Sequence, residues 1–101
     1  MLVVRNVFQL EFGKSKDAVA LMKQGLEIQK QALTGVEFST RLLTDLTGPF
    51  YTLVLELTVP DLASYEANAQ RLFSNEDWQA HYQKLAPLVK SGYREIFNVV
   101  A

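Results

Sequence analysis

Hydrophobic and polar residues alternate most clearly in residues 41–59, which read RLLTDLTGPFYTLVLELTV. Glycine tolerates a positive φ, and proline fixes φ and lacks an N–H, so Thr47-Gly48-Pro49 is expected to form a turn with Gly48 at positive φ. After the turn, one side of the chain carries Tyr51, Leu53, Leu55, Leu57 and Val59, and the other carries Phe50, Thr52, Val54, Glu56 and Thr58. A period of two predicts a hairpin whose second strand, residues 50–59, has one apolar and one mixed face.

A first strand is predicted for residues 2–12 and a last strand for residues 93–100. In the first strand, one face carries Leu2, Val4, Phe8, Leu10 and Phe12 and is interrupted by Asn6. The other face carries Val3, Arg5, Val7, Gln9 and Glu11, so it too is mixed in polarity. The opening strand of the hairpin is expected to start between Glu37 and Arg41, with Leu42 and Leu46 pointing inward.

Helical periodicity occupies the intervening segments. Apolar residues at helical spacing predict a helix from Ser15, its N-cap, to about Leu33, with Gly25 in close contact with the sheet. A second helix should begin at Asp61, break near residues 74–77 and restart with Ser74 or Asn75 as its cap. Trp78, His81 and Tyr82 fall on one face of the restarted helix, where Trp78 and Tyr82 are expected to stack in the core.

The predicted order is therefore βαββαβ, in a single domain spanning residues 1–101. Right-handed crossovers then give a ferredoxin-like α+β fold: a four-stranded antiparallel sheet in the order 4-1-3-2, with its helices on one face. The opposite face carries Val3, Val7, Phe50 and Val54 among polar residues. Because such a patch is too apolar for a monomer surface, we expect a homodimer whose two sheets face each other.

Composition excludes several classes of protein. The net charge is -1 and neither sign of charge is clustered, so a nucleic-acid partner is not expected. Without cysteine, disulfides, thiol nucleophiles and Cys-based metal sites are excluded, and a single histidine excludes a His pair within the chain. We expect neither a signal peptide nor a membrane segment, which makes a cytoplasmic location the default. No metal, cofactor or nucleotide-binding motif is recognised.

Three segments give the chain a resemblance to a known family. These are RLLTDLTGPFYT at 41–52, WQAHYQKLAPLV at 78–89 and SGYREIF at 91–97. They resemble the small NIPSNAP-like proteins of the dimeric α/β-barrel superfamily, over essentially the whole chain. The resemblance implies the ferredoxin-like fold and a dimer. The superfamily also includes cofactor-independent monooxygenases and haem-degrading enzymes, so whether the chain is an enzyme stays open.

The mixed face supplies the first set of candidate ligand-binding residues. These are Arg5, Val7, Gln9, Phe50, Thr52, Val54 and Glu56. Charges on a central strand need partners or water, so Arg5 and Glu56, or Arg41 and Glu56, are expected to pair. Such a pair is either structural or part of a pocket between the two sheets that orients a small organic molecule.

Asn6, Trp78 and His81 form a second, weaker set. Haem-degrading relatives use an Asn on the first strand with a Trp and a His, and the resemblance extends to these residue types. Trp78 and His81 are only three residues apart here, a closer spacing than in those relatives, and a structural His81 is the alternative. Three hypotheses remain: a small-molecule-binding dimer, a cofactor-independent monooxygenase and a haem-binding protein.

Overall fold

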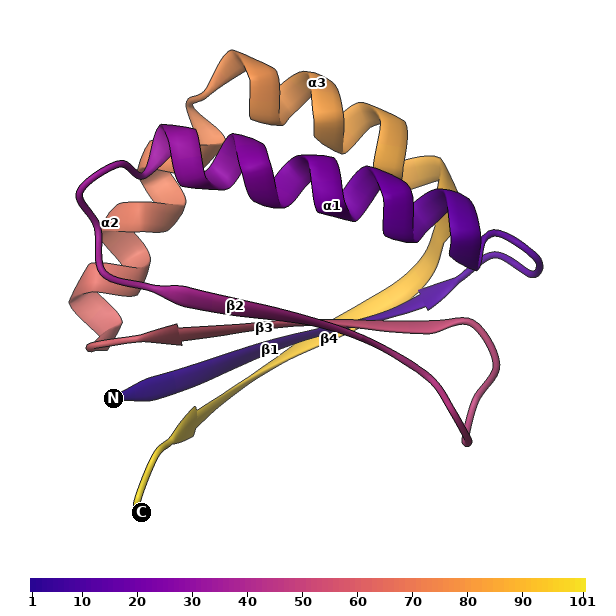
Figure 1. Ribbon diagram of the computed structural model, residues 1–101, viewed down its shortest axis with the longest axis horizontal. Coiled ribbons are helices and arrows are strands. Elements are labelled where there is room, and N and C mark those ends of the chain that lie inside the picture. Colours follow the sequence, from indigo (N-terminus) through magenta and orange to yellow (C-terminus); the bar gives the residue numbers. More distant parts are fainter.

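Helices cover only one face of the sheet, and the other face is bare (Figure 1). The computed structural model describes residues 1–101. The elements are β1 (Leu2–Leu10), α1 (Ser15–Ala32), β2 (Ser39–Thr44), β3 (Thr52–Val59), α2 (Leu62–Phe73), α3 (Glu76–Leu85), the 3₁₀ turn η1 (Ala86–Leu88) and β4 (Val89–Asn98). All strand pairs are antiparallel, in the order β2-β3-β1-β4. The predicted ferredoxin-like fold and its strand order are confirmed.

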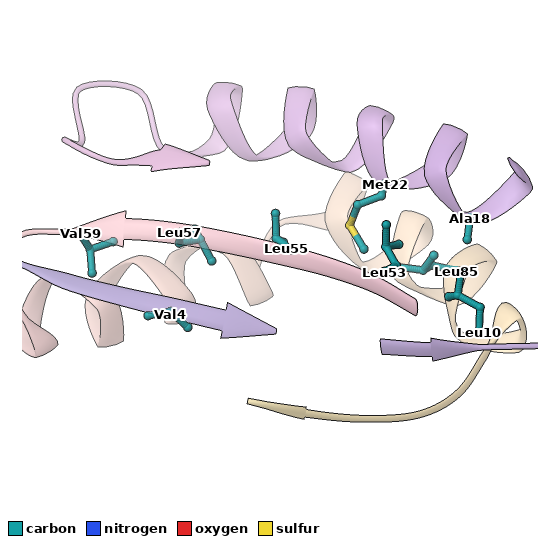
Figure 2. Packing of buried hydrophobic residues seen from close by; sticks show 9 residues of the cluster. All are labelled: Val4, Leu10, Ala18, Met22, Leu53, Leu55, Leu57, Val59 and Leu85. Carbon is teal, nitrogen blue, oxygen red and sulfur yellow. The ribbon is translucent and has the colours of Figure 1, made fainter. Parts of the chain in front are cut away.

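The core lies between the sheet and the helices, and it is built from alternate positions of the two central strands (Figure 2). Side chains of β1 and β3 on the covered face meet the apolar stripe of α1 and the end of α3. The buried cluster consists of Val4, Leu10, Ala18, Met22, Leu53, Leu55, Leu57, Val59 and Leu85. Full burial of a Leu or Val side chain contributes about 1.5–3 kcal/mol, so this layer is the main source of the domain's stability.

Two of the helix caps were predicted correctly, and one was not. The backbone N–H of Ser64 donates to Asp61 Oδ1 at 2.7 Å, and that of Trp78 donates to Asn75 Oδ1 at 3.0 Å. The hydrogen bond from the Ser64 backbone also lowers the pKa of Asp61. The prediction for α1 was wrong, because Lys14 occupies the N-cap position without a side-chain bond. Its N–H closes a turn on the Glu11 carbonyl at 3.1 Å, so the helix starts with Ser15 already inside it.

The turn between β2 and β3 is wider than the sequence suggested. Gly48 has a φ of 104°, as predicted. However, Asp45 Oδ1 accepts from the Thr52 N–H at 2.9 Å and closes the hairpin there, which leaves residues 46–51 outside the sheet. The expectations of an inward Leu46 and a strand position for Phe50 were therefore wrong. Leu46 is 97% exposed and Phe50 is 75% exposed.

The last strand begins earlier than predicted. β4 starts at Val89 rather than Tyr93, and Ser91-Gly92 lies within it instead of ending the preceding helix. A Cβ on Gly92 would lie 3.1 Å from the Val7 carbonyl oxygen and 3.2 Å from the Phe8 ring. Glycine at this position lets β4 pass close to β1. The sequence pattern had instead indicated that the preceding helix ends at this glycine.

Candidate functional site

The bare face of the sheet is arranged in rows that cross all four strands. One row carries alternating charge in the order Arg41, Glu56, Arg5 and Glu95 on β2, β3, β1 and β4. The next row is apolar and consists of Leu43, Val54, Val7 and Tyr93. We call this surface the uncovered face. Its charges and its apolar residues are therefore separated into bands rather than mixed at random.

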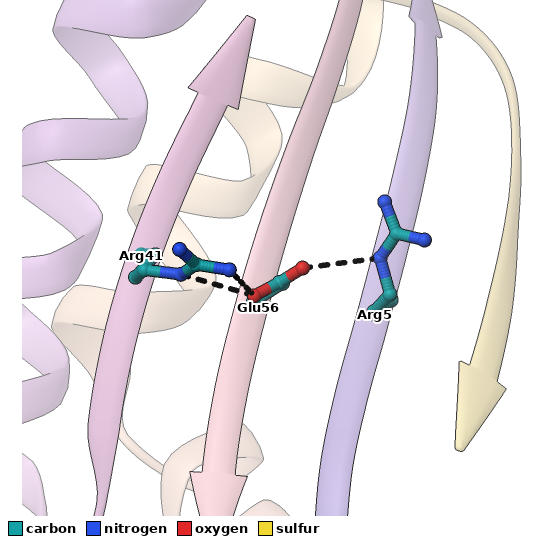
Figure 3. Close-up of polar contacts among 3 residues, drawn as sticks. All are labelled: Arg5, Arg41 and Glu56. Atoms are coloured by element: carbon teal, nitrogen blue, oxygen red, sulfur yellow. Dashed lines mark hydrogen bonds and ion pairs between the residues drawn. The ribbon is translucent and has the colours of Figure 1, made fainter. Parts of the chain in front are cut away.

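Glu56 lies between two arginines (Figure 3). Its Oε1 accepts from Arg41 Nη2 at 2.7 Å and from Arg41 Nε at 3.1 Å. Its Oε2 lies 3.2 Å from Arg5 Nε, an ion pair without the alignment of a hydrogen bond. Only 14% of the Glu56 side chain is exposed. The predicted pairing of Glu56 with Arg5 and with Arg41 is confirmed, and the carboxylate is shared between them.

The other residues predicted for this face all lie on one side of the charged row, toward the end of β1 and the start of β3. Val7 and Val54 are register partners in the apolar row, and Gln9 and Thr52 are partners further along the same strands. Phe50 is in the turn, where its carbonyl accepts a hydrogen bond from the Gln9 side chain. The central-strand residues are thus brought together, and Phe50 is attached to them through its backbone rather than as part of the sheet.

A cavity of about 90 Å³ lies on the opposite side, between the sheet and the helices. Its walls are mainly apolar and come from every layer of the fold. The sheet contributes Leu55 and Leu57 from β3, α2 contributes Tyr65 and Leu72, and α3 contributes Trp78. We call this space the helix-side cavity. Ligand sites in proteins are commonly apolar hollows with a few convergent polar groups, and this cavity has that composition.

Asn6 and Arg94 form the polar corner of the helix-side cavity. They are register partners on β1 and β4, and Arg94 Nε donates to Asn6 Oδ1 at 2.6 Å. The Arg94 guanidinium carbon lies 6.0 Å from the centre of the Tyr65 ring. Asn6 is buried, and its hydrogen bond holds the Arg94 guanidinium in place. Arg94 makes no ion pair with any carboxylate.

Gln29 adds a second buried polar group to the cavity lining. It belongs to the buried stripe of α1, where the neighbouring positions are apolar, and only 5% of it is exposed. Its Oε1 is buried and has no hydrogen-bond partner. An unpaired buried amide oxygen costs about 1–3 kcal/mol, so Gln29 is a polar group at a position where packing alone would favour Leu or Met.

Trp78 and His81 occupy different environments, although they stack on each other. Their ring centroids are 5.5 Å apart with a tilt of 33°. Trp78 is half-buried and lines the cavity, whereas His81 is 5% exposed, does not line it and bonds through Nε2 to the Leu21 carbonyl. The expected Trp78–Tyr82 stack was wrong, because Tyr82 points outward and is exposed.

Gly25 is needed for His81 rather than for the sheet. A Cβ at Gly25 would lie 2.5 Å from His81 Cε1. The predicted close contact of Gly25 is therefore real, but the expectation that the sheet was its partner was wrong. The His81 ring fills the gap between α1 and α3, the position of a structural histidine.

These placements do not fit haem. The residues named for it separate, since Asn6 and Trp78 line the helix-side cavity and His81 does not. The Nε2 atom of His81 is engaged with a backbone carbonyl, and a cavity of about 90 Å³ is far too small for a haem macrocycle. No group of three or more His, Asp or Glu side chains is placed to hold a metal ion. None of the helices has the length and apolar character that crossing a membrane requires.

Sequence reasoning missed Arg94, Gln29 and Tyr65 as candidate residues. The available signal was a polar residue at a core position of a periodic pattern: Asn6 and Gln29 both interrupt apolar faces. Arg94 gave no such signal, because its strand was predicted to start only at Tyr93 and its apolar pattern is weak.

Comparison with solved structures supports the fold. An uncharacterised NIPSNAP domain protein from Burkholderia xenovorans aligns with a TM-score of 0.88 and 21% identity, covering 100% of this chain and 96% of that one. A NIPSNAP family protein from Agrobacterium tumefaciens aligns with a TM-score of 0.83 and 19% identity, covering 96% and 90%. An antibiotic biosynthesis monooxygenase aligns with a TM-score of 0.76 and 16% identity over 100% of both chains. No protein-family model and no curated protein sequence matches the chain. The chain therefore shares the fold of NIPSNAP domain proteins and of a monooxygenase.

Proposed function

We propose that this protein is a NIPSNAP-like homodimer that binds a small organic molecule in the helix-side cavity of each subunit. The observation that supports this most directly is the cavity itself, an apolar space of about 90 Å³ with an anchored Arg94 and an unpaired Gln29. Unpaired polar groups reduce stability, and they are common where a ligand supplies the missing partner.

The uncovered face supports the dimer. Its apolar row and its charged row run side by side across the whole sheet, and helices cover only the other side. Two such faces related by a two-fold axis bury the apolar rows against each other. The charged row alternates in sign, so the same row of a second copy, running in the reverse order, would set opposite charges against each other.

A ligand between the two sheets, near Arg5, Gln9, Thr52 and Glu56, stays a prediction. The ion pairs weaken the case for a ligand at this position. Glu56 already accepts from Arg41 and neutralises Arg5, so the cluster has less need of a charged ligand. The helix-side cavity has the opposite character, because Arg94 has no counter-charge and Gln29 Oε1 has no hydrogen-bond partner. It is therefore the better-supported site.

Two measurements test the proposal. Light scattering should give twice the 11.4 kDa mass of the chain, and the chain mass itself would refute the dimer. Toluene should enter the cavity and shift the indole N–H resonance of Trp78, the only tryptophan. The variant Ala69→Leu, which adds volume to a residue of the lining, should abolish this shift. Ala67→Leu, at an exposed position of the same helix, is the control.

A cofactor-independent monooxygenase is the second candidate. It is favoured by the full-length alignment with an antibiotic biosynthesis monooxygenase, combined with a mainly apolar cavity. The lining contains no carboxylate, histidine, lysine or serine, so an enzyme of this kind would depend on an electron-rich substrate that activates oxygen itself. Oxygen uptake with hydroquinone substrates tests it. Uptake that is lost in Ala69→Leu would establish this activity, and uptake no faster than without protein would eliminate it for these substrates.

A further inference from the structure

Arg94 is a cation that the fold positions but does not neutralise. Its Nε is held by the buried Asn6 side chain at 2.6 Å, and the Tyr65 ring lies beside the guanidinium. The three ion pairs of the molecule are formed by Arg5, Lys30 and Arg41 with glutamates, and Arg94 has none. A guanidinium has five N–H donors, and Asn6 uses one of them. The other donors remain free beside the helix-side cavity.

Arg94 is also the only charged residue in the cavity lining. The other polar groups are the amides of Asn6, Gln29 and Asn68 and the Tyr65 hydroxyl, all of which are neutral. Within the lining, a cationic ligand therefore meets only a charge of its own sign. Anions meet a fixed donor, and guanidinium–carboxylate pairs form two parallel hydrogen bonds.

The charged residue of the cavity lining is exposed, whereas several of its apolar residues are buried. Arg94 lies on the edge strand β4 and is exposed to solvent, whereas Leu55, Leu57 and Leu72 are buried. A ligand that places a charged group at Arg94 keeps that group partly hydrated, and its apolar body enters the space between the sheet and α2. Engineered apolar cavities of about 150 Å³ admit benzene, and the helix-side cavity is smaller at about 90 Å³, so its ligand has at most one ring or a short branched chain.

From these contacts we propose that the ligand is a small apolar monocarboxylate, either a single-ring aryl acid or a branched short-chain acid. Its carboxylate binds the Arg94 guanidinium, and its hydrocarbon body packs against Leu55, Leu72 and Trp78. This inference rests on the proposed function, because it names the class of molecule that the same cavity takes.

Two acid–amide pairs of nearly equal shape test the charge requirement: benzoate with benzamide, and 3-methylbutanoate with 3-methylbutanamide. Calorimetric titration of the wild-type dimer should show at least one acid binding about ten- to hundredfold more tightly than its amide, as expected for charged hydrogen bonds. Benzamidine, the cationic counterpart of benzoate, should not bind.

Arg94→Gln should remove the preference for the acid while leaving toluene binding unchanged. Arg71→Gln is the matched control, because it removes the same charge from an exposed position on α2 outside the cavity lining. Unfolding midpoints of both variants, measured at equal protein concentration, verify that each is folded.

The outcomes separate this inference from the proposed function. If toluene binds but the amides bind as tightly as the acids, or if Arg94→Gln keeps the acid preference, the carboxylate assignment is wrong and the cavity function stands. If neither toluene nor any acid shifts the Trp78 resonance, both are wrong. Equal loss of acid binding in Arg71→Gln would show a general charge effect and would also overturn the assignment.

Discussion

The two faces of the sheet are made of alternate residues of the same strands, yet their polar side chains differ in how they are paired. On the uncovered face, Glu56 forms ion pairs with both Arg41 and Arg5. On the covered face, Arg94 has only a neutral amide for a partner, and Gln29 Oε1 has none. The charges of the uncovered face balance one another, although Arg5 Nε lacks an aligned hydrogen bond, whereas the covered side holds a cation without a counter-charge and an unpaired amide oxygen.

Under the proposed function, this contrast separates the surface for assembly from the site for ligand binding. A surface that will be buried against a second copy is more stable if its charges are already paired, because an unpaired charge in an interface loses its hydration without compensation. A cavity that will receive a ligand needs groups with free hydrogen-bonding capacity. Four substitutions test this division, beginning with the largest expected effect.

Val7→Glu should disrupt assembly alone. Val7 is in the apolar row of the uncovered face, where the two sheets are proposed to meet. Burying an unpaired carboxylate there should cost about 4 kcal/mol or more of dimer stability. Light scattering should then give a monomer that still binds toluene. Gln24→Glu adds the same charge to the exposed side of α1 and should remain dimeric. A dimeric Val7→Glu would place the interface elsewhere.

Gly25→Ala should destabilise the covered side by about 1–3 kcal/mol, because its Cβ would overlap the His81 ring. In an unhindered helix the same change would stabilise by about 1 kcal/mol, so the sign of the effect is informative. Urea unfolding at fixed protein concentration measures it. In a His81→Ala background the penalty should disappear. A penalty of the same size in both backgrounds would mean that another neighbour causes it.

Glu56→Gln should weaken the dimer by about 1–2 kcal/mol, since it leaves Arg5 and Arg41 without a counter-charge. The dissociation constant, measured by sedimentation equilibrium, should rise about five- to thirtyfold. Affinity of the helix-side cavity for its ligands should not change. A loss of cavity binding would contradict the separation of the two faces.

Gln29→Met should give the smallest effect, and in the opposite direction. Methionine has a similar shape and no buried oxygen to satisfy, so the free energy of unfolding should rise by about 1 kcal/mol. Thermal unfolding without ligand measures this gain. Leu26→Met, at a partly buried apolar position of the same helix, controls for the methionine itself. A destabilised Gln29→Met would indicate a structural role for the amide.

Local pattern, together with the handedness of crossovers, was sufficient for the order of elements, the strand order and the cap at Asp61, and it narrowed the cap of α3 to Ser74 or Asn75. The same alternation placed Arg5 and Glu56 on one face, and their pairing followed because their two strands are neighbours. These features depend on side-chain periodicity and on short-range hydrogen bonds, which can be read from adjacent residues.

Only the tertiary structure revealed the helix-side cavity. Asn6, Gln29 and Arg94 are far apart in the chain and belong to three different elements, so no local pattern connects them. The environment of Gly25 shows the same limit of sequence reasoning. A glycine within the helix indicated a close contact, but the partner is His81 on α3, 56 positions away along the chain. Which buried polar groups find partners depends on how the layers pack, and packing is a property of the whole fold.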